Sequence, residues 1–67
     1  MTERMIEVLV GYPDNFIETY VIHHNVWEEA IKEIQDEKQP NFHIGKKIFI
    51  KKELVAVGTK ECAFQFI

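Results

Sequence analysis

Three histidines and one cysteine are the side chains in this sequence best suited to hold a metal ion. His23 and His24 are adjacent, His43 lies further along, and Cys62 is the only cysteine. Successive side chains of an extended segment point to opposite faces, so His23 and His24 diverge if a strand runs through them. No CxxC, HxxxH or HExxH spacing is present. We therefore expect no metal site and interpret the two histidines as a junction between a strand and a helix; the alternative is a zinc site completed by Cys62.

Nucleophilic catalysis finds little support in the residue types present. The chain has no serine and three threonines, and Cys62 lies in an apolar run that predicts a buried, unreactive thiol. A nucleophile also needs an adjacent base and a group that orients the base. No spacing in the chain supplies that arrangement, so we expect a protein that is not an enzyme and uses no cofactor.

Carboxylates recur at helical spacing in the middle of the chain. Glu29, Glu33 and Glu37 are four residues apart, which gathers like charges on one helix face. Such a row is usually a solvated face. The functional alternative is an acidic surface that docks on a basic protein partner or imitates nucleic-acid phosphates. Its residues are Glu29, Glu33, Asp36 and Glu37.

Lysines dominate the C-terminal part of the chain. Residues 41–67 contain five lysines and two glutamates, although the whole chain has a net charge of −3. Together with Phe49 as a ring on which a base could stack, these lysines favour nucleic-acid binding as an alternative function. Strands also use lysine to block edge pairing, and Arg4 is the only arginine. The predicted nucleic-acid surface consists of Lys46, Lys47, Lys51, Lys52 and Lys60.

A helix in the middle of the chain must position the acidic row. Asn25 and Glu28 form a capping pair at its start, and Pro40 stops it. Its apolar side chains fall on one side of a helical wheel and predict a buried face: Trp27, Ala30, Ile31, Ile34 and the stem of Lys38.

Strands account for most of the remaining chain. Period-two alternation of apolar side chains predicts them over residues 5–10, 16–23, 47–51, 54–57 and 62–67, and a turn at Pro13 joins the first two. The resulting β-β-α-β-β-β order predicts an α+β domain of two layers. In it, one helix packs on a mostly antiparallel sheet of four to five strands.

One helix covers only one face of such a sheet. The face expected to meet it is Ile6, Val8, Val10, Ile48, Ile50, Val55 and Val57. Alternation then turns large apolar side chains to the other face, among them Leu9 with Tyr20 or Ile17 beside it. We predict a self-association surface made of Leu9, Tyr20, Phe49, Leu54, Phe64 and Phe66. The alternative is that the sheet curls and buries these side chains within one chain.

Sixty-seven residues allow a single small domain, residues 1–67. The lone cysteine favours a reducing compartment, so we expect the protein in the cytoplasm. No apolar run is long enough for a membrane span, and the first residues do not form a signal peptide. A chain this short is marginally stable alone, so we expect a homodimer.

These observations predict a protein-protein interaction module without enzymatic activity. It would dock on a partner protein through the acidic helix face or the exposed apolar sheet. The small β/α chain without an active-site motif resembles the short accessory proteins of bacteria and their viruses, and that resemblance implies an inhibitor that binds and blocks its partner. Nucleic-acid binding through the lysines is the alternative.

Overall fold

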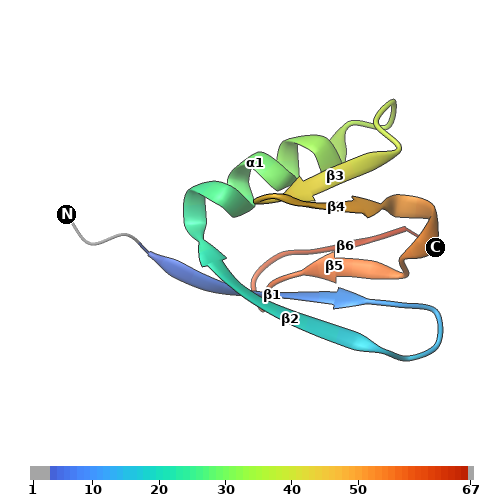
Figure 1. The fold of residues 1–67 in the computed structure, drawn as a ribbon, viewed down its shortest axis with the longest axis horizontal. Helices are drawn as coiled ribbons and strands as arrows, with labels where there is room; N and C mark the ends of the chain where they lie inside the picture. The colour runs from blue at the N-terminus through green and yellow to red at the C-terminus, as the bar shows by residue number, and fades with distance from the viewer. Residues whose placement is uncertain (1–3, 67) are drawn as a thin grey trace.

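The computed structural model describes residues 4–66. Over this range one α-helix is combined with six strands, which confirms the α+β class and the predicted order of elements (Figure 1). A strand over 41–44, not predicted from the sequence, is the addition. The elements are β1 (Met5–Gly11), β2 (Ile17–His23), α1 (His24–Gln35), β3 (Asn41–Ile44), β4 (Lys47–Ile50), the 3-10 helix η1 (Lys51–Glu53), β5 (Ala56–Gly58) and β6 (Ala63–Gln65).

The strands form two sheets rather than the single sheet expected. Four antiparallel strands lie in the order β2-β1-β5-β6, and the β3-β4 hairpin is a separate sheet. The separation occurs at η1, which interrupts the extended chain between β4 and β5. In Figure 1, α1 and the β3-β4 hairpin lie together on one side of the four-stranded sheet. They are the covering layer, and none of the described residues 4–66 forms a layer on the opposite face of the four-stranded sheet.

The β1-β2 hairpin follows the predicted turn. The Tyr12 N–H donates to the Phe16 carbonyl at 2.8 Å, which closes the loop. Asn15 adopts φ 68°, a left-handed conformation that asparagine tolerates better than most residues. This turn fixes the register of the two strands, in which Leu9 lies opposite Thr19.

Helix α1 begins and ends earlier than predicted. It starts at His24, so Asn25 lies inside the first turn and the predicted capping pair does not form there. Glu28 instead lies 3.1 Å from the Nδ1 of His24. The predicted apolar face is confirmed at Trp27, Ala30 and Ile34, which are buried. Ile31 is half-buried, and Lys38 lies exposed beyond the end of the helix. No helix in residues 4–66 is long and apolar enough to span a membrane.

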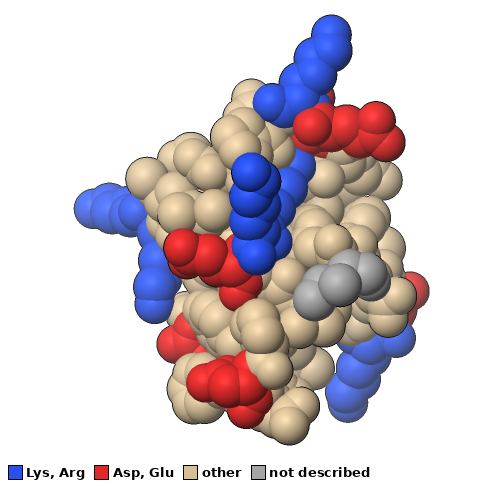
Figure 2. All heavy atoms as spheres, turned by 90° about the vertical axis from the view of Figure 1, so that its right-hand side faces the viewer, with Lys and Arg blue, Asp and Glu red and all other residues tan. Residues whose placement is uncertain are grey.

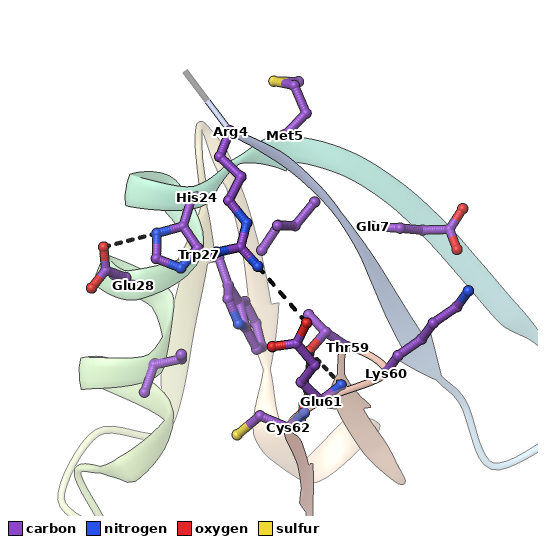
Figure 3. A pocket seen from close by; sticks show the side chains of 12 residues that line it. Arg4, Met5, Glu7, His24, Trp27, Glu28, Thr59, Lys60, Glu61 and Cys62 are labelled. Atoms are coloured by element: carbon purple, nitrogen blue, oxygen red, sulfur yellow. Dashed lines mark hydrogen bonds and ion pairs between the residues drawn. The ribbon is translucent and has the colours of Figure 1, made fainter. Parts of the chain in front are cut away.

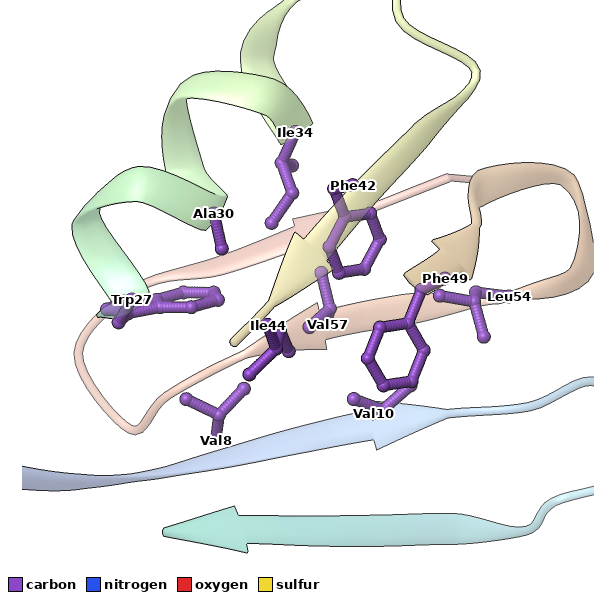
Figure 4. Packing of buried hydrophobic residues seen from close by; sticks show 10 residues of the cluster. All are labelled: Val8, Val10, Trp27, Ala30, Ile34, Phe42, Ile44, Phe49, Leu54 and Val57. Atoms are coloured by element: carbon purple, nitrogen blue, oxygen red, sulfur yellow. The ribbon is translucent and has the colours of Figure 1, made fainter. Parts of the chain in front are cut away.

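The core lies between the four-stranded sheet and its covering layer (Figure 4). Its side chains come from both layers, so that β1 and β5 meet α1, β3 and β4 across it. The buried residues are Val8, Val10, Trp27, Ala30, Ile34, Phe42, Ile44, Phe49, Leu54 and Val57.

The predicted orientation of β4 is wrong. Phe49 is only 5% exposed, whereas Ile48 is 59% exposed and Ile50 is also at the surface. In a single sheet, Ile48 and Ile50 were expected to face the helix. Because β4 instead pairs with β3 in the covering layer, Phe49 faces the core, and Ile48 and Ile50 face outward. Phe49 lies across the strands from Phe42, and their rings stack with centroids 5.3 Å apart.

The predicted self-association surface is therefore corrected at several positions. Phe49 and Leu54 belong to the core. The Tyr20 ring is half-buried, edge-on to Phe49 with centroids 5.7 Å apart, and Phe64 and Phe66 are half-buried against the core. Of that set, Leu9 remains a surface residue. The alternative, burial within one chain, is correct for Phe49 and Leu54.

Candidate functional site

The histidines and Cys62 do not gather at one point, although His24 and Cys62 line the same pocket. His43 lies in β3, where its Nδ1 is 3.2 Å from Glu33 Oε1, and His24 contacts Glu28 at the start of α1. Cys62, which the sequence placed in a buried strand, is exposed just before β6. Within residues 4–66, no group of three or more histidine, cysteine or acidic side chains could hold a metal ion.

Of the four residues of the predicted acidic helix face, Glu29 and Glu33 lie on α1, whereas Asp36 and Glu37 follow its end at Gln35. Some of these carboxylates help to hold the fold together. Glu33 Oε1 accepts the His43 backbone N–H at 2.8 Å and tethers α1 to β3. That N–H, aided by the His43 ring, lowers the pKa of the Glu33 carboxyl. Asp36 Oδ1 accepts the Lys38 N–H, and Glu29 lies 3.5 Å from Lys32 Nζ. The predicted acidic surface thus has charges that are already compensated at Glu29 and Glu33.

Two of the five predicted phosphate-binding lysines are engaged within the chain. Lys51 Nζ donates to the carbonyl oxygens of Glu33, Ile34 and Asp36 at 2.7, 3.2 and 2.9 Å. Lys47 Nζ donates to the Tyr20 hydroxyl at 2.9 Å and lies over its ring. These contacts draw both ammonium groups toward the protein.

The remaining lysines do not form one patch with them. Lys46 is in the β3-β4 turn, Lys52 in η1 and Lys60 in the β5-β6 loop, and these turns lie at different places in the fold. On the face shown in Figure 2, lysines and acidic side chains are interspersed. The structure therefore does not gather a continuous basic surface from the predicted residues.

A shallow pocket lies between the start of α1, the start of β1 and the β5-β6 loop (Figure 3). Its volume is about 610 Å³, and Trp27 and Ile31 are among its apolar lining residues. Arg4 lies 3.8 Å from Glu61 across it. Because the charge of Arg4 is matched by that carboxylate, the pocket offers little attraction to an anion. No sequence pattern predicts this pocket, because its walls come from three segments that are far apart in the chain.

The outer face of the four-stranded sheet gathers large exposed apolar side chains. Leu9 is 39% exposed, Met5 49%, Ile17 62% and Val21 63%. The β1-β2 register places them on one side, because Leu9 lies opposite Thr19 and Gly11 opposite Ile17. We call Met5, Leu9, Ile17 and Val21 the outer apolar face. Of the two partners considered for Leu9, Ile17 shares its face and Tyr20 does not.

Sequence reasoning missed half of the outer apolar face. Met5 and Val21 were not among the predicted surface residues, although both lie on alternating strands beside residues that were considered. The signal was present: Met5 and Leu9 are four residues apart on β1, and Ile17 and Val21 four apart on β2. An even spacing in a strand places two side chains on the same face.

A polar network runs along the inner side of β2. Glu18 accepts a hydrogen bond from the Tyr12 hydroxyl, and a second one from Tyr20 helps to lower the pKa of its carboxyl. The same bond to Glu18, with some burial, raises the pKa of Tyr12 to about 12. Lys47 reaches the Tyr20 hydroxyl from β4. This network links the covering layer to the β1-β2 hairpin.

Comparison of the chain with known protein families, with curated proteins and with solved structures gave no match.

Proposed function

We propose that this chain is a non-enzymatic protein-interaction module that docks on a partner protein through its outer apolar face. The observation that supports this best is that four large apolar side chains lie exposed on one uncovered sheet face. Scattered single hydrophobic residues are normal on a protein surface, whereas a group on one face favours an interaction site.

The predicted acidic surface and the predicted lysine surface are less suited to binding a partner. Glu33 and Asp36 already accept hydrogen bonds within the chain, and Lys47 and Lys51 donate theirs inward. Using Glu33 or Lys51 for a partner would break contacts that tie α1 to β3 and η1, and using Lys47 would break the contact between β4 and β2. The outer apolar face takes no part in these contacts, so a partner can bind there without breaking them.

The side chains of the outer apolar face indicate which chemical groups a partner surface must present. Glu7 lies on β1 between Met5 and Leu9, and it points to the same side. A complementary protein surface is apolar and presents one cation opposite Glu7, because an unpaired carboxylate buried in an interface is unfavourable. Binding without chemistry is the action of an accessory protein or inhibitor, as the resemblance to short bacterial and viral accessory proteins implies.

The test is affinity capture from the native host with matched variants. Leu9→Lys places a charge in the centre of the outer apolar face, and Glu37→Ala instead alters the predicted acidic surface just beyond the end of α1. We expect a partner that the wild type and Glu37→Ala retain and that Leu9→Lys loses. Circular dichroism should show that all three proteins are equally folded. A partner retained by Leu9→Lys and lost by Glu37→Ala would contradict the proposal and identify the acidic surface as the site.

A further inference from the structure

The four-stranded sheet has two edge strands, and the longer one is β2. β2 is the outermost strand in the order β2-β1-β5-β6, and Figure 1 shows it at the margin of the molecule. The opposite edge strand, β6, has three residues, but β2 has seven. Short edges resist pairing, whereas a long edge offers a template for another strand.

The hydrogen-bond pattern identifies which backbone groups of β2 point outward. The His24 N–H donates to the Arg4 carbonyl and the Tyr12 N–H to the Phe16 carbonyl, both at 2.8 Å. In an antiparallel ladder, residues that exchange hydrogen bonds alternate with residues that do not. With this register, Tyr20 bonds to β1, while Thr19 and Val21 point their N–H and C=O groups away from it.

Nothing in the sequence of β2 blocks this edge. Ile17–His23 contains no proline, glycine or lysine, the residues that proteins commonly place on exposed edges. Within residues 4–66, no backbone hydrogen bond outside the β1-β2 ladder reaches Ile17, Thr19 or Val21. Their side chains also stand on the outer apolar face, so the edge is apolar as well as open.

We propose that β2 pairs in antiparallel fashion with β2 of a second copy of this chain, about a twofold axis at Thr19. This goes beyond the proposed function, because it names a second copy of the chain as the occupant of the strand edge rather than of the sheet face. The two four-stranded sheets then join into one continuous sheet with a shared outer apolar face. Edge pairing of this kind is an established mode of strand recognition.

The sequence of β2 is complementary to itself in this register. Ile17 lies opposite the partner's Val21 and Thr19 opposite the partner's Thr19, which are favourable β-branched pairs. A register centred on Tyr20 would instead place Ile17 opposite the partner's His23. Apolar side chains therefore match best when the axis passes through Thr19.

Charges also match across the axis. Tyr20 lies opposite the partner's Glu18, and Lys47 Nζ is 2.9 Å from the Tyr20 hydroxyl. Each Lys47 is thus brought toward the carboxylate of the partner's Glu18, and the twofold axis repeats the pair. No like charges lie directly opposite each other between residues 16 and 22, which makes a second copy the occupant best suited to this edge.

The contact is small, because it rests on one strand from each chain. Interfaces of less than about 1,200 Å² are typical of transient complexes. The dimer is therefore reversible, and its population rises with protein concentration. Pairing at the β2 edge can therefore be detected by varying the protein concentration.

Sedimentation and amide hydrogen exchange on the wild-type protein provide the test. At about 1 mM protein we expect a mass near twice the 7.9 kDa of one chain, with slow exchange at the Thr19 and Val21 amides. On dilution, these amides should exchange at least about tenfold faster, while the Tyr20 amide stays protected by β1. A chain that is monomeric at about 1 mM, or a dimer in which the Thr19 amide exchanges freely, would overturn the proposal.

Variants separate this edge from the outer apolar face. Thr19→Pro removes an outward N–H without removing a bond to β1, and Thr19→Val keeps that N–H as the matched control. We expect Thr19→Pro to be monomeric and folded, with Trp27 still buried by fluorescence, and Thr19→Val to dimerise. Leu9→Lys should still dimerise even though it loses the docking partner, so the two proposals can fail independently. A folded Thr19→Pro that dimerises as wild type does would contradict edge pairing.

Discussion

The ammonium nitrogen of Lys51 lies 2.7 Å from the backbone carbonyl oxygen of Glu33, in the last part of helix α1. The same nitrogen reaches the carbonyls of Ile34 and Asp36, which follow in the chain. The last carbonyls of a helix have no partners within it and form the negative end of its dipole. Lys51 therefore caps α1 from η1 and joins the two parts of the covering layer.

Replacing Lys51 by methionine should destabilise the protein. Lys51→Met keeps most of the apolar stem but leaves the three carbonyls without this donor, so the free energy of unfolding should fall by about 1–2 kcal/mol. Urea unfolding followed by Trp27 fluorescence measures this. Lys52→Met, the neighbouring control, should change stability by less than about 0.5 kcal/mol. Equal effects of the two substitutions would show that Lys51 does not act as a cap.

Glu33 should matter more than its neighbours in the acidic row. Glu33→Ala removes the acceptor of the His43 N–H and should lower the free energy of unfolding by about 1 kcal/mol at neutral pH. Glu37→Ala is the matched control, with an expected change below about 0.5 kcal/mol.

The contribution of Glu33 should also depend on pH. The His43 backbone N–H, and then the His43 ring, lower the pKa of Glu33 below its ordinary 4.5. A lowered carboxyl pKa stabilises the fold above about pH 4.5, and this stabilisation is lost as the pH falls through the folded-state pKa. The difference between wild type and Glu33→Ala should therefore shrink as the pH is lowered below 4.5. A difference that is constant with pH would contradict a role for the charged carboxylate.

Tyr12 should make the protein sensitive to alkali. Its hydrogen bond to Glu18 raises the pKa of Tyr12 from 10.0 to about 12, because ionisation would place two negative groups in contact. The stability gained from the neutral phenol is complete below pH 10 and is lost as the pH rises toward 12. We expect Tyr12→Phe to remove the tyrosinate absorbance change near pH 12 and to lessen the alkaline loss of stability. A Tyr12 that titrates near pH 10 would show that the bond does not persist in solution.

Local signals were enough to predict the hairpin and the helix. Pro13 and Asn15 mark a turn by their backbone preferences, and the spacing of Trp27, Ala30 and Ile34 defines a buried helix face. Each of these features depends on residues close together in the sequence, so the chain's own pattern specifies them.

The layers and the functional surface depended on distant residues. Ile48 and Phe49 are both apolar, so alternation in β4 cannot say which one faces the core; pairing with β3 and the stack on Phe42 decide it. Sequence spacing likewise could not predict which lysines are engaged within the chain. Lys51 caps α1 because η1 passes close to the end of that helix. No spacing in the sequence indicates this contact.

Paired substitutions in β4 test the corrected orientation. Phe49 packs between Phe42 and Tyr20, with ring centroids 5.3 and 5.7 Å away, whereas Ile48 is on the outside of the hairpin. Phe49→Leu should therefore leave a gap and lower the free energy of unfolding by about 1–2 kcal/mol. Ile48→Thr keeps the β-branch that suits a strand and should change stability by less than about 0.5 kcal/mol. Chemical denaturation of both variants measures the difference. A larger loss for Ile48→Thr would restore the single-sheet arrangement expected from alternation, and Phe49 would then return to the surface available for binding.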